Sequence, residues 1–152
     1  TPASKRYQSM LAEGEAIERF VQGEIEHLAN GQLVMPVDMP GAAVGPEHAL
    51  RENIPVIRTK HGTWRVVSGL AVNANALFTS ELGEQLAEKC GSFALLWYAH
   101  SDGEVKCSLR SRGKVDVAAM AEKFGGGGHR NAAGFRMPLA QFIEDILKRS
   151  AR

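Results

Sequence analysis

The chain has 152 residues, of which 44% are hydrophobic and 23% are charged, and its formal net charge is +1. These values are typical of one globular domain, with or without an appended element, and argue against a broad surface for nucleic-acid backbone. No apolar run approaches the roughly 18 to 20 residues of a membrane-spanning helix, so we expect no membrane association. The two cysteines, Cys90 and Cys107, form no Cys-x-x-Cys pair, which argues against a disulfide framework or a zinc site. Two isolated thiols and an N-terminus without a hydrophobic signal region predict a cytoplasmic protein.

Residues 5–29 are predicted to form a helix, because apolar residues recur at helical spacings from Met10 to Leu28. Asn30-Gly31 is a helix stop. The sequence opens without a methionine, which favours a piece of a longer protein. We therefore expect residues 1–30 to be a linker helix from an upstream domain; the alternative is a surface helix that packs on its own domain.

Residues 31–152 are expected to form an α/β domain, with a mixed sheet of about five strands flanked by helices. The predicted strand segments are 32–37, 55–58, 64–72, 93–100, 105–111 and 131–137, and the predicted helices are 79–90, 117–124 and one from Pro138 onward. The run 93–100 is continuously apolar and suits a strand buried on both faces. Residues 38–53 are expected to be a loop with a short helical turn, and Asp116 is expected to cap the helix that follows it.

Four consecutive glycines, from Gly125 through Gly126 and Gly127 to Gly128, are followed by His129 and Arg130. Glycine tolerates positive φ and has no Cβ to block a ligand, so successive N–H groups can point into one concavity. An imidazole and a guanidinium beside those amides predict a binding place for phosphate. The alternative is a simple helix-ending turn. The Walker pattern is absent, which excludes a P-loop ATPase.

A second group of residues precedes this loop. Lys106, Arg110, Arg112 and Lys114 form a run of cations without an acid, and the period of two in a strand places Lys106, Ser108 and Arg110 on one face. Such a face can simply be solvated. If the intervening helix packs on the sheet, however, strand and loop converge, and Arg110 can hold a phosphate or stack on a base, with Ser108 or Ser111 beside it.

These motifs resemble a known family. Ser-Leu-Arg-Ser (108–111), Phe-Gly-Gly-Gly-Gly-His (124–129) and Ala-Ala-Gly-Phe (132–135) are similar to the C-terminal associated domain of DHH-superfamily phosphoesterases, especially the oligoribonuclease and exopolyphosphatase-like members. Residues 72–75, 80–83 and 92–98 also resemble that family. The resemblance covers about residues 64–137.

The resemblance implies an upstream DHH domain, in which aspartates and an Asp-His-His motif hold two divalent metals, manganese or magnesium, that activate a water. It implies that Gly126, Gly127, Gly128 and His129 hold the substrate phosphate, and that Arg110 with Ser108 or Ser111 holds the neighbouring phosphate or base. Independently of the resemblance, the position of Arg130 beside the glycine loop lets it add charge, and Asn75, in the irregular stretch before a predicted helix, can touch the substrate.

This sequence contains no Asp-His-His, so we expect no catalytic or metal-binding residue in the chain and no hydrolysis by the chain alone. The expected substrate is a nucleotide or short oligonucleotide phosphate. Nano-RNA, 3′-phosphoadenosine 5′-phosphate, cyclic dinucleotides and polyphosphate all remain open.

Two other interpretations also stay open. The chain can be a freestanding nucleic-acid-binding module without a catalytic parent, because a related domain of alanyl-tRNA synthetases contacts RNA. A homodimer, through the N-terminal helix or a sheet edge, is a further possibility. Trp64, Trp97 and Tyr98 lie in apolar segments and are expected in the core rather than at a base-stacking surface.

Overall fold

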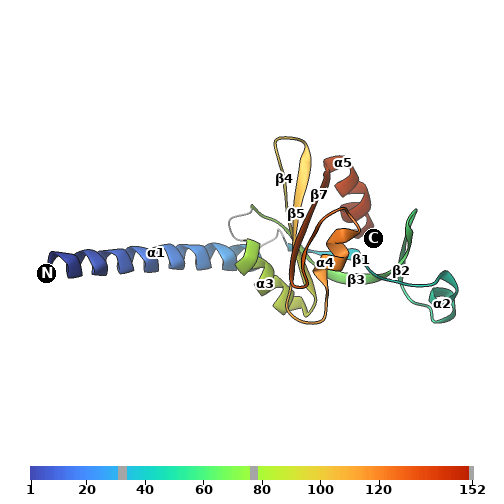
Figure 1. Cartoon of the computed structure of the whole chain (residues 1–152), viewed down its shortest axis with the longest axis horizontal. Coiled ribbons are helices and arrows are strands. Elements are labelled where there is room, and N and C mark those ends of the chain that lie inside the picture. Colours follow the sequence, from blue (N-terminus) through green and yellow to red (C-terminus); the bar gives the residue numbers. More distant parts are fainter. Residues whose placement is uncertain (31–33, 76–78, 151–152) are drawn as a thin grey trace.

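The computed structural model describes residues 1–30, 34–75 and 79–150 (Figure 1). A long helix leads into a domain in which strands and helices alternate. The elements are α1 (Pro2–Asn30), β1 (Val34–Ala43), α2 (Pro46–Arg51), β2 (Val56–Thr59), β3 (Gly62–Asn73), α3 (Thr79–Cys90), β4 (Phe93–Ala99), β5 (Glu104–Ser111), α4 (Val117–Glu122), β6 (Gly127–His129), β7 (Ala132–Pro138), α5 (Leu139–Phe142), η2 (Ile143–Leu147) and α6 (Lys148–Ser150). The last three follow one another without a break and form one C-terminal helix with a π-helical middle.

One mixed sheet of seven strands organises the domain, in the order β1-β3-β4-β5-β7-β6, with β2 paired to β3 off this path. The β3–β4 pair is parallel and the other pairs are antiparallel. The predicted α/β class with a mixed sheet is therefore confirmed, although the sheet has more strands than the five or so expected. The short strand β6 was not predicted, because a glycine-rich run has low strand propensity.

The first strand is longer than the sequence predicted. β1 continues through Ala43, so the loop expected over residues 38–53 begins only after it, and α2 supplies the expected helical turn. Pro36 and Pro40 are tolerated because β1 is an edge strand, where a missing N–H donor breaks no ladder bond on the outer side. The register shifts between Pro40 and Ala43, as in a β-bulge. The first two residues of the predicted strand 32–37 lie outside the described residues.

Each face of the sheet has its own hydrophobic core. On the side that we call the α4 side, α4 and the C-terminal helix cover strand residues such as Leu95, Leu109 and Phe135. On the opposite α3 side, α3 and the end of α1 cover others, including Val72 and Leu96. β4 contributes alternate residues to both cores, which confirms the prediction that residues 93–100 form a strand buried on both faces.

The helix α1 projects away from the sheet, as Figure 1 shows, and only its C-terminal part packs on the domain. Ile25 is fully buried, whereas Tyr7, Ile17 and Phe20 are each more than 60% exposed. The predicted helix is confirmed, while its role as a linker from an upstream domain stays a prediction. Among the described residues, no helix combines the length and the apolar character needed to cross a lipid bilayer.

Candidate functional site

Arg110 and His129 are brought into one cross-strand row by the register of three neighbouring strands. Arg110 of β5 is opposite Ala132 of β7, and Ala132 is opposite His129 of β6. Residues directly opposite each other point to the same face, so Arg110 and His129 share the α3 side of the sheet. Two strand spacings place their Cα atoms about 10 Å apart.

A second row lies beside the first. Ser108 is opposite Gly134, and Gly134 is opposite Gly127. The residues of β7 between the two flanks are thus alanine and glycine, so nothing larger than the methyl group of Ala132 stands between Arg110 and His129. We call this surface the Arg110–His129 face; it comprises Ser108, Arg110, Gly127, His129, Ala132 and Gly134.

The guanidinium of Arg110 is held in place without a counter-ion. Its side chain is half-buried under α3, where Gly83 leaves it room: a Cβ at Gly83 would lie 2.5 Å from the Cγ of Arg110. Nη1 donates a hydrogen bond of 2.9 Å to the carbonyl of Leu109, which leaves its other N–H groups available. Arg110 makes no ion pair with any described residue, so the positive charge is uncompensated.

The glycine loop differs from the expected row of four bare amides. The N–H of Gly125 donates to the carbonyl of Glu122, and the N–H of Gly126 donates to that of Ala121, so both amides close the end of α4. His129 is exposed, and its imidazole has no hydrogen-bond partner in the described part of the chain. The open part of the loop is therefore the edge strand β6, from Gly127 to His129.

The glycines of this loop differ in how much room the fold leaves for a side chain. A Cβ at Gly126 would lie 2.1 Å from the carbonyl oxygen of Gly134, and a Cβ at Gly128 would lie 2.6 Å from that of Ala132. These two positions need glycine because β7 approaches closely. A Cβ at Gly127 would meet nothing within 4 Å, so the fold itself leaves that position open.

Two predicted site residues, Ser111 and Arg130, make hydrogen bonds to the backbone of the domain. Ser111 is only 3% exposed and lies on the opposite face of β5 from Arg110, because neighbouring strand residues alternate. Its hydroxyl donates 2.8 Å to the carbonyl of Val115 and accepts 2.9 Å from the amide of Asn131. The guanidinium of Arg130 donates 2.9 Å to the carbonyl of Lys114. These bonds tie the turn after β5 to the turn before β7.

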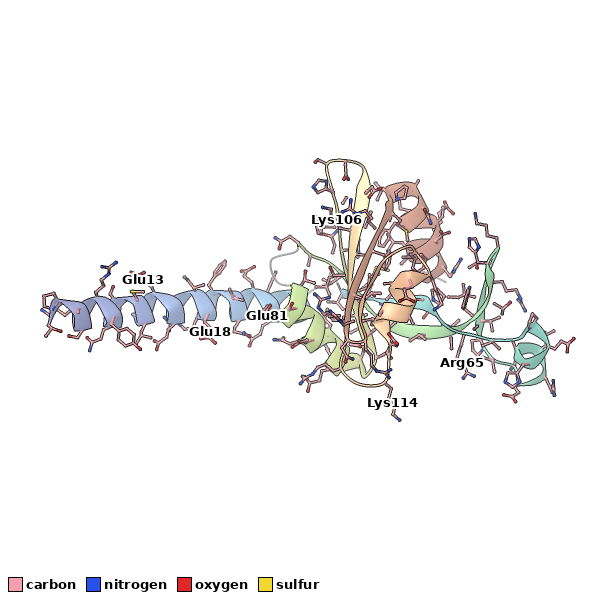
Figure 2. All side chains as sticks on the ribbon, in the orientation of Figure 1. Glu13, Glu18, Arg65, Glu81, Lys106 and Lys114 are labelled. Carbon is pink, nitrogen blue, oxygen red and sulfur yellow. The ribbon has the colours of Figure 1, made fainter. Side chains whose placement is uncertain are left out.

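The run of four cations from Lys106 to Lys114 does not form one cluster in the structure. Figure 2 shows Lys106 and Lys114 at opposite ends of β5 and its following turn. Arg112 forms a 2.7 Å ion pair with Glu88 of α3. Of the four, only Arg110 therefore lies in a row with His129.

Asn75 is also separate from this face. It follows β3, whose last residue Asn73 is in register with Trp97, and Trp97 is opposite Cys107. Asn75 therefore lies toward the Lys106 end of the sheet rather than level with Arg110.

No described part of the chain offers a metal site. Among the described residues, no three His, Cys, Asp or Glu side chains gather closely enough to hold a metal ion. The described residues therefore do not fit the divalent metal, which the sequence resemblance assigns to an upstream DHH domain.

The DHHA1 domain family matches residues 65–152, which are more than half of the chain. The chain belongs to the DHHA1 domain family. The resemblance inferred from the sequence, that of a domain associated with DHH phosphoesterases, is confirmed. The match includes both flanks of the Arg110–His129 face and Gly83 of α3, whereas residues before 65 lie outside it.

Individual relatives of this DHHA1 domain share only parts with it. An uncharacterized protein of Acanthamoeba polyphaga mimivirus is 44% identical over 61 residues, which are 38% of this chain and 14% of that protein. A crystal structure of an uncharacterized protein from Helicobacter pylori has 24% identity and a TM-score of 0.36, over 57% of this chain and 23% of that one. The pGpG-specific phosphodiesterase PggH from Vibrio cholerae has 11% identity and a TM-score of 0.38, over 54% of this chain and 31% of that one.

TM-scores this low establish no shared activity, and the chain spans less than a third of the length of each relative. What sequence reasoning missed in this DHHA1 domain is the part played by small residues. Gly83 makes room for Arg110, and Ala132 with Gly134 keeps the surface between Arg110 and His129 clear. The role of these small residues follows from the strand register, which the sequence does not give without knowledge of which strands pair.

Proposed function

We propose that this chain is the substrate-binding domain of a metal-dependent phosphoesterase that hydrolyses short oligonucleotides or phosphorylated nucleotides. One observation carries the proposal: Arg110 and His129 share a row with only Ala132 between them, and no described carboxylate pairs with the guanidinium. Membership of the DHHA1 family supports the class of parent enzyme.

On this proposal, the two flanks of the face hold one phosphate from both sides. Arg110 donates charge-assisted hydrogen bonds to the phosphate oxygens, and the imidazole of His129 donates from the opposite flank. The hydroxyl of Ser108 lies beside Arg110, and the open backbone at Gly127 lets an anion approach the main chain closely. A divalent metal of an upstream DHH domain would activate the attacking water, while the residues of this chain bind and orient the phosphate.

The test is a calorimetric titration of the chain with a dinucleotide carrying a 5′-phosphate, and with the unphosphorylated dinucleoside. We expect weak binding of the first only. Because a hydrogen bond to a charged group contributes about 1.5–3 kcal/mol, Arg110→Ala should weaken binding by about 10- to 100-fold. His129→Ala should also weaken it, whereas Arg112→Ala, a control cation that is paired with Glu88, should bind as the wild type does.

Unchanged binding in both the Arg110 and the His129 variants would falsify the proposed phosphate site. A manganese-dependent phosphodiesterase assay of the chain alone should show no turnover. Hydrolysis by the purified chain that is absent from a mock preparation would contradict the assignment of the chemistry to another domain.

A further inference from the structure

A separate cleft lies on the α4 side of the sheet, on the face opposite to the Arg110–His129 face. It is bounded by the turn between β2 and β3, the end of α4 and the C-terminal helix, and has a volume of about 780 Å³. Such a volume lies within the range of sites for small ligands. We call it the α4 cleft; its lining includes Arg58, Lys60, Trp64, Lys123, Phe124 and Arg149.

The charge in this cleft is strongly unbalanced. Four cations line it, namely Arg58, Lys60, Lys123 and Arg149, against the carboxylate of Asp145. Arg58, Lys60 and Arg149 make no ion pair with any described residue. The neighbouring Lys148, by contrast, pairs with Glu144 at 2.6 Å. A set of cations that converges on a concave surface without counter-charges attracts an anion.

Two aromatic rings in the cleft are held in fixed positions. The indole Nε1 of Trp64 donates 3.2 Å to the hydroxyl of Thr59. The Nζ of Lys123 lies 4.9 Å from the centroid of the same ring and donates 3.0 Å to the carbonyl of Ala119. On the adjacent wall, Phe124 stacks on Phe135 with ring centroids 4.8 Å apart.

Trp64 was expected in the core, but it is only partly buried and lines the cleft. The apolar segment around Trp64 predicted a core position. The N-terminal end of β3, however, extends past the main core to pair with β1 and β2. Burial lowers the pKa of Lys123, which fits an ammonium held against an aromatic ring and partly withdrawn from water.

Flat rings at fixed positions among unpaired cations match the chemistry of a nucleotide: bases stack on aromatic faces, and phosphates pair with cations. An acidic peptide would use the cations but has no need of the rings. We propose that the α4 cleft is a second binding site, which takes a nucleotide unit of single-stranded nucleic acid. The proposal does not depend on phosphate binding at the Arg110–His129 face.

The test is fluorescence anisotropy with a 5′-fluorescein-labelled hexaadenylate RNA, titrated with the chain at several salt concentrations. The variant is Arg58→Ala/Lys60→Ala, in which both substituted side chains are exposed. The matched control is Arg51→Ala/Arg65→Ala, which also removes two exposed cations near the hairpin. Arg65 follows Trp64 in β3, so its side chain points to the other face of that strand. Neither control residue lines the cleft.

We expect the cleft variant to bind the RNA about five- to tenfold more weakly at low salt. The plot of log association constant against log salt concentration should become shallower by about 1.4, because each of the two lost phosphate contacts on a single strand contributes about 0.7 to the magnitude of the slope. The control should change affinity by less than about twofold. Equal losses in the two variants, or none in either, would overturn the site.

Tryptophan fluorescence tests the stacking directly. In a Trp97→Phe background, Trp64 is the remaining tryptophan of the chain, and the RNA should quench its emission. Quenching should persist when Arg110→Ala and His129→Ala are added, which separates this site from the proposed phosphate site. Absence of quenching, or an equally tight complex of the cleft with a hexaglutamate peptide, would contradict the assignment to nucleic acid.

Discussion

Arg110 and His129 are 19 positions apart in the sequence, yet they occupy one row of the sheet with Ala132 between them. The row exists only in this register, because a slip of one residue between β6 and β7 would turn His129 to the α4 side. The register depends on close backbone contacts at Gly126 and Gly128, and the glycine loop therefore has a structural part and an open part.

Within β6, Gly127 is the glycine at which the fold leaves room for a side chain, and substitutions along the loop should separate the structural role from the binding role. A Cβ at Gly127 meets no atom within 4 Å, so Gly127→Ala should keep the wild-type melting temperature within about 2 °C. It should nevertheless weaken binding of the 5′-phosphorylated dinucleotide by about fivefold or more, because the methyl group stands where a phosphate approaches the main chain.

The matched variants are Gly126→Ala and Gly128→Ala. Their Cβ atoms would overlap the backbone of β7, and overpacking of this kind costs about 1–3 kcal/mol. The melting temperature of each should fall by several degrees. Equal stability in all three variants would show that the close approach of β6 to β7 is not a constraint.

Ser108 and Ser111 are predicted to respond in opposite ways to substitution. Ser111 is buried and makes two short hydrogen bonds, with Val115 and Asn131. Ser111→Ala leaves those partners unsatisfied and should lower the free energy of unfolding by about 1–3 kcal/mol. Ser108→Ala removes a hydroxyl on the Arg110–His129 face, so it should change stability by less than about 0.5 kcal/mol but weaken dinucleotide binding several-fold. Urea denaturation and calorimetry measure the two effects, and a Ser108 variant that binds normally would remove this residue from the site.

Gly83 is predicted to position Arg110. A Cβ there would lie 2.5 Å from the Cγ of Arg110 and 2.9 Å from its Cβ, so Gly83→Ala must displace the arginine stem. We expect a loss of dinucleotide affinity that approaches that of Arg110→Ala. Because both changes act through the same guanidinium, the double variant should lose no more than Arg110→Ala alone. Additive losses in this double-mutant cycle would mean that Gly83 affects binding by another route.

Sequence patterns predicted the parts of this fold that depend on local periodicity. The alternation in β5 correctly placed Ser108 and Arg110 on one face, and the apolar run of β4 correctly indicated burial on both sides. Asp116 was predicted to cap the helix after it, and its carboxylate accepts a hydrogen bond from the N–H of Ala119.

Features that depend on pairing between distant segments could not be read in the same way. The loop at Gly127 becomes a strand only because β7 lies beside it, and Pro40 is compatible with β1 only because that strand is at an edge. Arg112 could not be separated from Arg110 by sequence, because its partner Glu88 lies in a helix 24 positions away. The residue types of the candidate site could thus be named from the sequence, whereas the sequence could not show which of these residues share a row of the sheet.

The buried thiol of Cys107 should make stability fall at high pH. Burial raises its pKa from 9.0 to about 12. Below pH 9 the thiol is protonated in both the folded and the unfolded chain, so stability does not depend on it. Between about pH 9 and 12 only the unfolded chain loses the proton, which lowers the free energy of unfolding by up to about 1.4 kcal/mol per pH unit. Urea denaturation at pH 8 and pH 10.5 should therefore show a larger decrease in the free energy of unfolding for the wild type than for Cys107→Ala, whatever the absolute stability of the variant.

Alkylation tests the burial of the same thiol. In native protein at pH 8, iodoacetamide should modify the exposed Cys90 and leave Cys107 unmodified until the chain unfolds. Parallel pH dependence in the two proteins, or rapid alkylation of Cys107 in the folded state, would show that this thiol is not shielded by the core.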